Sequence, residues 1–486
     1  MKNRLWGKRM LAIMATATLA LPLIAGCTAS ENKDNEQRVL RVATPWGGQD
    51  DSYFRQQFTD AFELTHGNVT IEIVPAVDQG SMYGYGNSEE QQEVPDTLES
   101  LKKIMTGDNP VDVIVADTST IKSLIQENMV KQLDPLMQED KFDTSDIVPS
   151  VLEGIKDLGD QNIYALTPTF SSSALFYNKG MFEKAGVEPP TDNMTWDDIF
   201  NLATRLTKGE GKDHVFGLSF STHNGGSPYY SMQQYYNSLQ LKVFDDKAEK
   251  MTVDSPQWEK VWSTVSKLAI DKVIPKGDEP QDQDQNSNGR YNPMQGDLFL
   301  SGKTAMAIGD YYYINQLIDA NKNADKMKDF TKVDWDVVTP PVHPEAPEIG
   351  GNIYLSSLMA INSSAQNPDD AWELIKYMNS EDWAKIKARS SYELVSRKSY
   401  IKPKDGLDYN VQAFYTLKPV PPTNTNLDKM YQKMPGLWQV SDKGMEYFNQ
   451  VLENKKTPKE ALGEWAAKGN EMLAKLKKDP KTTFQQ

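Results

Sequence analysis

Cysteine is nearly absent from this sequence, because Cys27 is the single one among 486 residues. An intramolecular disulfide needs two cysteines and a thiol-rich metal site needs several, so neither can form within the chain. Histidine is scarce too, and the four histidines share no close metal-ligand spacing: His66, His214, His223 and His343. The sequence therefore excludes a disulfide framework and a thiolate metal centre.

Positive charge is also in short supply. Lys and Arg total 52 against 68 Asp and Glu, which gives a formal net charge of −16 and a pI near 4.9. Binding to nucleic acid needs a basic patch, so we expect no nucleic-acid partner. With 38% apolar and 25% charged residues, the composition is that of a soluble globular protein, and 486 residues favour two domains.

Common catalytic motifs are missing as well. The sequence contains neither a nucleophile motif nor HExxH. Gly302-Lys303-Thr304 ends like a phosphate-binding P-loop, but the first glycine of such a loop would stand at position 297, which is Asp297. These absences are consistent with a protein that acts without covalent chemistry.

A long apolar run is present only near the N-terminus. Residues 1–9 hold four basic residues, and residues 10–24 are apolar or small throughout. This is the pattern of a signal peptide, and the run is too short to span a bilayer. No later run reaches the length of a membrane span, so we expect the mature protein to sit on the membrane surface.

The apolar run ends in Leu23-Ile-Ala-Gly-Cys27, which resembles a bacterial lipobox. The resemblance implies cleavage before Cys27 and diacylglycerol (palmitate) on its sulfur, which would give durable anchoring. We expect residues 1–26 to be a lipoprotein signal peptide and residues 27–37 a flexible tether. The predicted location is the extracellular face of the cell membrane; the alternative is an ordinary secreted protein with a chance cysteine.

Strand and helix patterns alternate after the tether. We predict strands at 39–44, 69–74 and 111–116, and helices at 53–64, 97–105 and 119–127. Alternation of this kind indicates a parallel sheet, in which ligands bind beyond the carboxyl ends of the strands. The candidates so placed are Trp46, Gln49 and Asp50 after the first strand and Asp117 after the third.

The stretch from Ile163 to Val187 is predicted to be the crossover between two lobes and the floor of the cleft between them. Pro168 should end a short apolar strand, because its ring removes a hydrogen-bond donor and forces Thr167 to be extended. A small, flexible break at residues 171–173 would then separate it from a new strand at 174–177. The helix that follows should end at Gly186.

Several segments together resemble bacterial extracellular solute-binding proteins of the sugar-binding family, the maltose-binding-protein-like receptors of ABC importers. They are residues 174–179, 182–190 running to 195–198, 302–309, 367–378 and 457–462. The resemblance implies an α/β, two-lobed periplasmic-binding-protein-like fold (type II) with the ligand cleft between the lobes. The N-terminal lobe would comprise 38–167 and 350–388, and the C-terminal lobe 168–349 and 389–486.

The resemblance also implies a function. The protein would capture a carbohydrate, a mono- or oligosaccharide, by lobe closure and deliver it to the permease subunits of an ABC transporter, acting as a monomer without a cofactor. The implied ligand-binding residues are Trp46, Gln49, Asp50, Asp117, Phe170, Ser171, Tyr229, Asp310, Tyr311, Asn352 and Trp438. Carboxylates and amides bind sugar hydroxyls, while flat rings cover the C–H faces of the sugar. In the tyrosine runs at 229–230, 235–236 and 311–313, about half of the rings must be structural.

A polar stretch at 284–295 matches the start of a calcium loop. Oxygen-bearing residues stand at the first, third and fifth positions, and a glycine stands at the sixth. The candidate ligands are Asp284, Asn286, Asn288 and Arg290. The twelfth residue is Gln295 where a calcium loop has glutamate, so an ordinary polar turn is the alternative.

Two other functions remain open at this point. A surface-bound carbohydrate-active hydrolase would need two carboxyl groups about 5–9.5 Å apart across the scissile bond, and it would form product. A ligand-sensing receptor that signals to a membrane partner without transport would share every feature above. Identification of the partner would separate that receptor from a transport protein.

Overall fold

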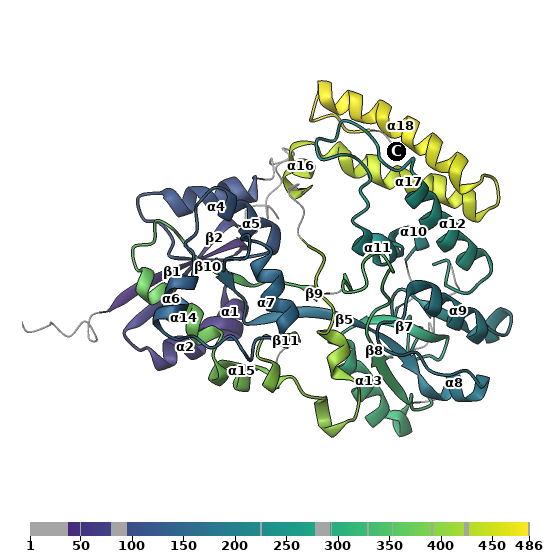
Figure 1. The fold of residues 1–486 in the computed structure, drawn as a ribbon, viewed down its shortest axis with the longest axis horizontal. Coiled ribbons are helices and arrows are strands. Elements are labelled where there is room, and N and C mark those ends of the chain that lie inside the picture. The colour runs from purple at the N-terminus through teal and green to yellow at the C-terminus, as the bar shows by residue number, and fades with distance from the viewer. Residues whose placement is uncertain are drawn as a thin grey trace, which may run out of the picture.

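The computed structural model describes residues 37–48, 50–78, 95–223, 226–277, 292, 294–327, 330–351, 353–389, 392–421 and 427–484. Five of the predictions above concern residues outside these ranges: the signal peptide with Cys27, the tether up to residue 36, Gln49, the loop at 284–290 and Asn352. The described chain forms two lobes, the first on the left and the second on the right of Figure 1. No helix among the described residues has the length and apolar character needed to cross a membrane.

The first lobe is built on a sheet with the order β2-β1-β3-β10-β4 among the described strands. Its strands are β1 (Arg38–Gly47), β2 (Val69–Asp78), β3 (Val113–Ala116), β4 (Ala165–Leu166) and β10 (Leu358–Ile361). β1 is parallel to β2 and β3, as the alternation predicts, and β10 is antiparallel to both of its neighbours. The late strand β10 thus lies between two strands formed by the first third of the chain.

Helices cover both faces of this sheet (Figure 1). They are α1 (Ser52–Phe54), α2 (Asp60–Thr65), α4 (Thr97–Thr106), α5 (Thr118–Gln126), α6 (Asp134–Glu139), α7 (Pro149–Lys156), α14 (Pro368–Met378) and α15 (Glu381–Lys387). The helix predicted at 53–64 is interrupted by a π-helical turn over Arg55–Thr59. The helices predicted at 97–105 and 119–127 are confirmed, and the side chains of Asp96 and Asp117 cap their first turns.

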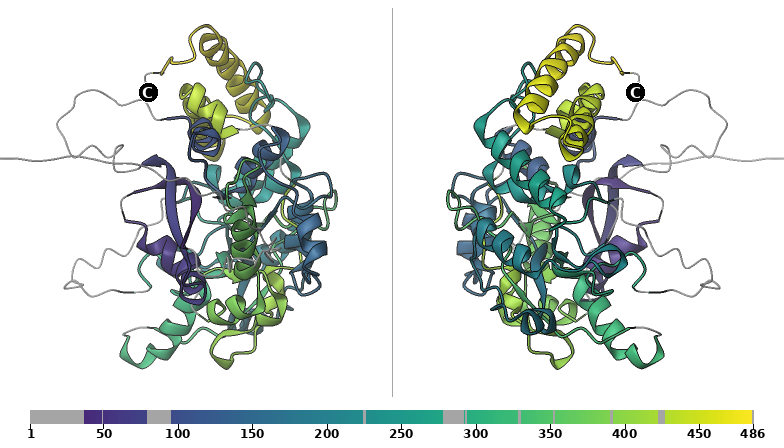
Figure 2. Two further views of the ribbon diagram at one scale, coloured as in Figure 1. Left: turned by 90° about the vertical axis from the view of Figure 1, so that its left-hand side faces the viewer. Right: turned by 90° about the vertical axis from the view of Figure 1, so that its right-hand side faces the viewer.

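The second lobe contains the sheet β11-β5-β7-β6, with β8 and β9 also paired to β5. Its strands are β5 (Thr169–Asn178), β6 (Phe216–Ser219), β7 (Thr304–Asp310), β8 (Trp335–Val338), β9 (Ile353–Tyr354) and β11 (Leu394–Val395). Its helices are α8 (Lys179–Ala185), α9 (Trp196–Leu206), α10 (Pro228–Ser231), α11 (Gln233–Tyr236), α12 (Pro256–Ile270), α13 (Tyr313–Lys322), α16 (Leu427–Lys433), α17 (Gly436–Leu452) and α18 (Pro458–Lys478). Short 3-10 turns lie at Gly211–Asp213, Asn237–Leu239, Ala324–Lys326, Lys398–Tyr400, Lys404–Gly406 and Val411–Phe414. Figure 2 places the C-terminal helices at one end of the molecule.

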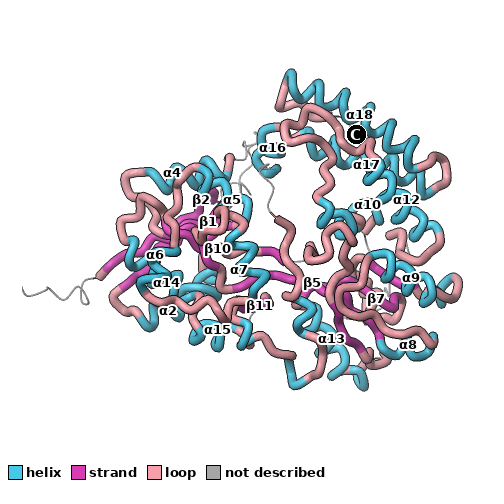
Figure 3. Tube along the Cα trace, viewed as in Figure 1, coloured by secondary structure: helices cyan, strands magenta, loops and turns pink. Residues whose placement is uncertain are grey.

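β5 runs from the first lobe into the second (Figure 3). It pairs with β11 at residues 169–170, with β9 at 171–172, with β7 at 173–177 and with β8 at 175–178. The flexible break predicted at 171–173 is therefore wrong, because backbone pairing with β9 and β7 holds these three serines in an extended strand. The predicted stop at Gly186 is confirmed, with this residue in the left-handed conformation at φ 62°.

Asp112 joins three parts of the first lobe. Its carboxylate is 1% exposed and accepts hydrogen bonds from the backbone N–H groups of Arg41 (3.0 Å), Gln366 (2.9 Å) and Asn367 (2.8 Å). It thereby connects β1, the start of β3 and the segment before α14. A buried carboxylate satisfied by three backbone donors stabilises the fold more than a neutral contact does.

We predict that Asp112→Ala lowers the free energy of unfolding by about 3 kcal/mol, because buried backbone donors lose a charged acceptor. Urea denaturation followed by far-UV circular dichroism measures the change. Asp108→Ala is the matched control, since Asp108 is exposed, and should stay within about 0.5 kcal/mol of the parent protein. Equal effects of the two substitutions would contradict the role given to Asp112.

Candidate ligand-binding site

The middle of β5 is surrounded by polar and aromatic side chains that arrive from distant parts of the sequence. We name this group the crossover cluster and define it as Ser171, Asp310, Tyr312, Tyr354, Tyr392 and Glu393. The strand register brings it together: Ser171 faces Tyr354 across the β5–β9 pair, Ser173 faces Asp310 across the β5–β7 pair, and Phe170 faces Leu394 across the β5–β11 pair. Segments from both predicted lobes thus meet on one strand.

Glu393 supplies a carboxylate directly above β5. Its Oε2 accepts a hydrogen bond from the Thr169 hydroxyl (2.6 Å), and its Oε1 accepts one from the Ser171 hydroxyl (2.8 Å) and a longer one from Ser356 (3.4 Å). These hydroxyls hold the carboxylate in place without neutralising its charge. This acid comes from the segment directly before β11.

Asp310 ends β7 and provides the second carboxylate. The residue is exposed, yet enough protein surrounds its carboxyl group for burial to raise the pKa above its ordinary value. Among the described residues no donor lies within hydrogen-bond distance of this carboxylate. Its charge also contributes, after burial, to raising the pKa of the neighbouring Tyr354. Asp310 therefore offers free acceptor oxygens in a partly desolvated position.

Three exposed tyrosine rings complete the crossover cluster. Tyr312 and Tyr392 meet edge to face with ring centroids 4.9 Å apart, and they are 43% and 58% exposed. Tyr354 is 59% exposed. Large rings left this open beside carboxylates form a surface suited to a ligand with apolar faces and hydroxyl edges.

The carboxyl edge of the first-lobe sheet lies next to this cluster. Ala43 and Ile114 are register partners, so Trp46 and Asp117, each three residues further on, lie level at that edge. Trp46 is 38% exposed. Asp117 accepts hydrogen bonds from Thr120 N–H (2.8 Å) and the Ser119 hydroxyl, and it is therefore also a helix cap. Asp50 follows β1 and accepts a hydrogen bond from Ser52 N–H (3.0 Å); the Ser52 hydroxyl, followed by this N–H, lowers the pKa of the Asp50 carboxyl.

The segment after Tyr354 connects this edge to the cluster. Leu358 pairs with Ala116, and the Thr118 hydroxyl donates to the carbonyl of Leu355 at 3.2 Å. Of the predicted site residues, Ser171 and Asp310 lie in the crossover cluster, and Asp117 lies beside Thr118, which contacts the segment between β9 and β10.

A family model described as bacterial extracellular solute-binding protein matches residues 46–385, well over half of the chain. The chain belongs to this family. Two relatives are a binding protein of Brucella abortus (strain 2308), 23% identical over 389 residues, and the sn-glycerol-3-phosphate-binding periplasmic protein UgpB of Shigella flexneri, 19% identical over 400 residues. The first alignment covers 78% of this chain and 83% of the relative, and the second covers 78% and 82%.

Solved structures share the fold. A sugar transporter protein from Rhizobium etli in an open conformation superposes with a TM-score of 0.60 at 19% identity, covering 89% of this chain and 99% of that one. The sugar-binding protein MalE from Xanthomonas citri gives a TM-score of 0.60 at 17% identity, covering 90% and 98%. The predicted two-lobed type II α/β fold is confirmed. Since the family consists of binding proteins, this solute-binding protein is not an enzyme, and the hydrolase alternative is set aside.

Of the rings predicted to contact ligand, two lie in the core of the solute-binding protein and a third, Tyr229, packs against it. Phe170 is fully buried and Tyr311 is 5% exposed. Tyr229 donates its hydroxyl to the carbonyl of Ser441 at 2.5 Å, and its ring packs beside Trp262 and Trp465. The exposed rings are those of the next residues, Tyr230 at 50% and Tyr312 at 43%. The expectation that half of the rings in each tyrosine run are structural is confirmed for 311–313.

Trp438 lies on α17, away from the crossover cluster. It is 58% exposed and stacks on Tyr431 of α16, with ring centroids 4.1 Å apart and an interplanar angle of 20°. Tyr230 of α10 lies against α17 as well, with its hydroxyl 3.3 Å from the Asp442 carboxylate. These rings form a second aromatic surface on the second lobe, and we define it as Tyr230, Tyr431 and Trp438.

A pocket of about 310 Å³ opens beside the end of β6. Ser219, Ser221, His223, Pro228 and Leu298 are among its lining residues. Thr222, between two of them, packs against Gly309, where an added Cβ atom would lie 3.0 Å from the Thr222 methyl group. Within the described residues, His, Cys, Asp and Glu form no group of three that could hold a metal ion.

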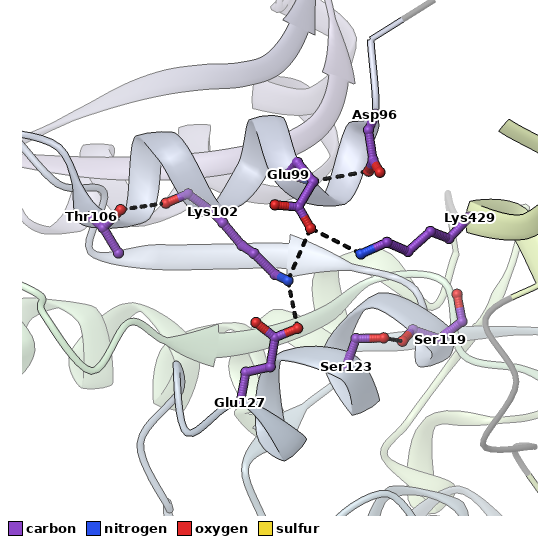
Figure 4. A network of polar contacts seen from close by, with 8 residues as sticks. All are labelled: Asp96, Glu99, Lys102, Thr106, Ser119, Ser123, Glu127 and Lys429. Carbon is purple, nitrogen blue, oxygen red and sulfur yellow. Dashed lines mark hydrogen bonds and ion pairs between the residues drawn. The ribbon is translucent and has the colours of Figure 1, made fainter. Parts of the chain in front are cut away.

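An ion-pair network joins the two lobes at a second place (Figure 4). Lys429 of α16 lies 2.9 Å from Glu99 of α4, and Lys102 bridges Glu99 and Glu127. The Lys429 ammonium, followed by that of Lys102, holds the pKa of the Glu99 carboxyl below its ordinary value. The lobes of the solute-binding protein are thus connected both by β5 and by this network, which we name the α4–α16 link.

We predict a coupling free energy of about 0.5 kcal/mol between Glu99 and Lys429 in a double-mutant cycle with Glu99→Gln and Lys429→Met. The coupling should approach zero in 1 M NaCl, where the screening length is about 3 Å. Small-angle scattering of Lys429→Met should show a larger radius of gyration than that of the parent protein.

The matched control is Lys433→Met, because Lys433 lies on the same helix and makes no ion pair with a described residue. It should leave the radius unchanged. If both variants have the radius of gyration of the parent protein, the α4–α16 link does not determine the spacing of the lobes.

Proposed function

We propose that this solute-binding protein captures a carbohydrate, a mono- or oligosaccharide, between its lobes and delivers it to the permease of an ABC transporter. The observation that carries the proposal is the crossover cluster. In it, exposed tyrosine rings lie beside two carboxylates, and the whole group surrounds β5, the strand that runs from one lobe into the other. Sugars present hydroxyls at the ring edge and C–H groups on the ring faces, so a binding site needs both kinds of group.

In the proposed complex, each part of the cluster has a task. The rings of Tyr312 and Tyr392 cover a sugar face, while Asp310 and Glu393 accept hydrogen bonds from hydroxyls. Trp46 and Asp117 would reach the ligand from the first lobe when the lobes close. Closure follows because the ligand contacts both lobes only in the closed state, so its binding free energy favours that state.

The similar proteins support the same ligand class. The structure from Rhizobium etli is that of a sugar transporter protein, and the one from Xanthomonas citri is sugar-binding. An ABC substrate-binding protein from Listeria monocytogenes in complex with cycloalternan also shares the fold, with a TM-score of 0.53 at 18% identity. UgpB is named for sn-glycerol-3-phosphate and so belongs to another ligand class.

We propose further that Cys27 carries the lipid that holds the mature protein on the extracellular face of the membrane, where it acts as a monomer. The lipobox-like sequence Leu23-Ile-Ala-Gly-Cys27 supports this. A diacylglycerol group contributes two acyl chains, which suffice for stable anchoring. The loop at 284–295 stays a candidate calcium site, with a polar turn as the alternative.

A thermal-shift panel of sugars, polyols and glycan fragments tests the ligand class. A matching sugar at 100 times its Kd should add about 2.7 kcal/mol to the stability of the protein.

Tyr392→Ala should weaken the binding of that sugar by about 1 kcal/mol, a five- to tenfold increase in Kd, because the stacking of the ring on the sugar is lost. Leu64→Ala removes an 86% exposed side chain from α2 and should leave the Kd unchanged. If no compound in the panel raised the melting temperature of the protein, the proposal would be contradicted.

Detergent phase partitioning tests the anchor. The protein produced in a bacterium with lipoprotein processing should enter the detergent phase, and Cys27→Ser should leave it in the aqueous phase as an unprocessed or soluble product. Thr28→Ser is the control, because it alters a neighbouring side chain without removing the thiol. Aqueous partitioning of the parent protein would favour the ordinary secreted form.

A further inference from the structure

The strands around the crossover cluster are almost free of charge. They comprise β5 and residues 304–313, 353–361 and 392–396, and the charged side chains among them are Asp310 and Glu393. Both are acids. The cluster therefore presents negative charge to a ligand, with no lysine or arginine in these segments to offset it.

The first-lobe edge that faces the cluster has the same character. The residues that follow β1 and β3 there contribute the acids Asp50 and Asp117. The first basic residue after β1 is Arg55, which is paired with Asp51 at 2.9 Å and with Glu63 at 3.3 Å. Closure of the lobes would thus bring a second set of acids towards the ligand.

Nearby cations are engaged elsewhere. Lys404 donates to the side-chain carbonyl of Asn315 at 3.1 Å and lies over the buried ring of Tyr311. Arg397 is buried and donates to the carbonyls of Asn379 (2.8 Å) and Asp143 (2.9 Å). Arg389, three residues before Tyr392, is exposed, and no ion pair with Asp310 is found among the described residues.

Helix N-termini, which also attract anions, already face carboxylates at this site. The N-terminus of α5 is capped by Asp117 itself. Asp310 precedes the first residue of α13 by three positions, so negative charge stands before that positive end as well. Recognition of phosphate or carboxylate normally uses arginine, lysine or free helix N-termini, and the described part of the site offers none of them to the ligand.

We infer that the ligand of this protein is a saccharide without negative charge, either neutral or bearing a protonated amine, and that sugars carrying a phosphate or carboxylate group are excluded. Asp310 determines this selection. Its free oxygens require donors from the ligand, which hydroxyl and ammonium groups supply and an anion does not. The inference rests on the proposed carbohydrate function and narrows it.

The test compares matched ligands by isothermal titration on the full mature chain. The neutral sugars that respond in the thermal panel are each paired with their 2-amino, uronate and phosphate derivatives, and sn-glycerol 3-phosphate and inorganic phosphate are added as plain anions. We expect neutral or amino members to bind and every anionic member to bind at least a hundredfold more weakly than its neutral parent, since like charges brought together are repelled.

Asp310→Asn tests the assignment to one side chain, because it keeps the shape and removes the charge. The variant should reduce the difference between neutral and anionic partners at least tenfold, and it should weaken an amino sugar relative to the neutral sugar. Glu183→Gln on α8 is the matched control, an exposed acid outside the site, and should leave all the ratios unchanged.

The outcomes separate the two proposals. Binding of an anionic member as tight as that of its neutral parent, or an Asp310→Asn variant with unchanged ratios, overturns the charge selection and leaves the carbohydrate function standing. Preferred binding of a plain anion overturns it as well, and loss of that binding in Arg389→Gln would identify the cation responsible. No response from any sugar overturns the carbohydrate function and this inference together.

Discussion

The structure depends on the backbone pairing of β5. This strand is hydrogen-bonded to four others, and each partner arrives from a different part of the chain. Pairing on this scale holds an extended strand between two lobes whose helices otherwise pack against separate sheets. Because the side chains of a strand alternate in direction, β5 buries Phe170 and Phe176 in the core while Ser171 points towards Glu393. The same strand thus supports both the core and the candidate site.

Two of the connections between the lobes differ greatly in strength. The ladder around β5 is cooperative and buried, whereas the α4–α16 link is a surface ion pair of the kind that contributes a few tenths of a kcal/mol. A weak contact far from a strong one is suited to adjusting the relative population of two lobe arrangements without endangering either fold. The free energy of ligand binding, several kcal/mol for a micromolar ligand, readily exceeds the strength of this link.

Much of the fold could be predicted from the sequence because local signals agreed with the final packing. The early strands lie where continuous apolar runs stand, and the helices predicted at 97–105 and 119–127 formed. The serine run at 171–173 could not be read in this way, because its strand conformation comes from partners far away in the sequence. Small polar residues signal a break only where no such partner is available.

The candidate site was predicted only in part, again because partners that are distant in the sequence decide which side chains meet. Residues at strand ends, such as Trp46, Asp117 and Asp310, follow from the parallel-sheet rule or from family resemblance. Glu393, Tyr392 and Tyr354 belong to short segments that pair with β5 for two residues each, and no periodicity marks so short a strand. In the tyrosine runs, alternation predicted that some rings face inward, but which of them do so depends on register, and register is set by tertiary pairing.

The strand order of the first sheet also bears on how the protein is made. β3 and β4 do not touch each other; β10 lies between them, and Leu358 follows Leu166 by 192 positions. A nascent chain that has just completed β4 therefore lacks the strand that joins β4 to the rest of the first sheet, and that strand is made only after a further 192 residues. During that interval the first sheet is incomplete, so the apolar side chains of β3 and β4 lack the partner strand that joins them into one core.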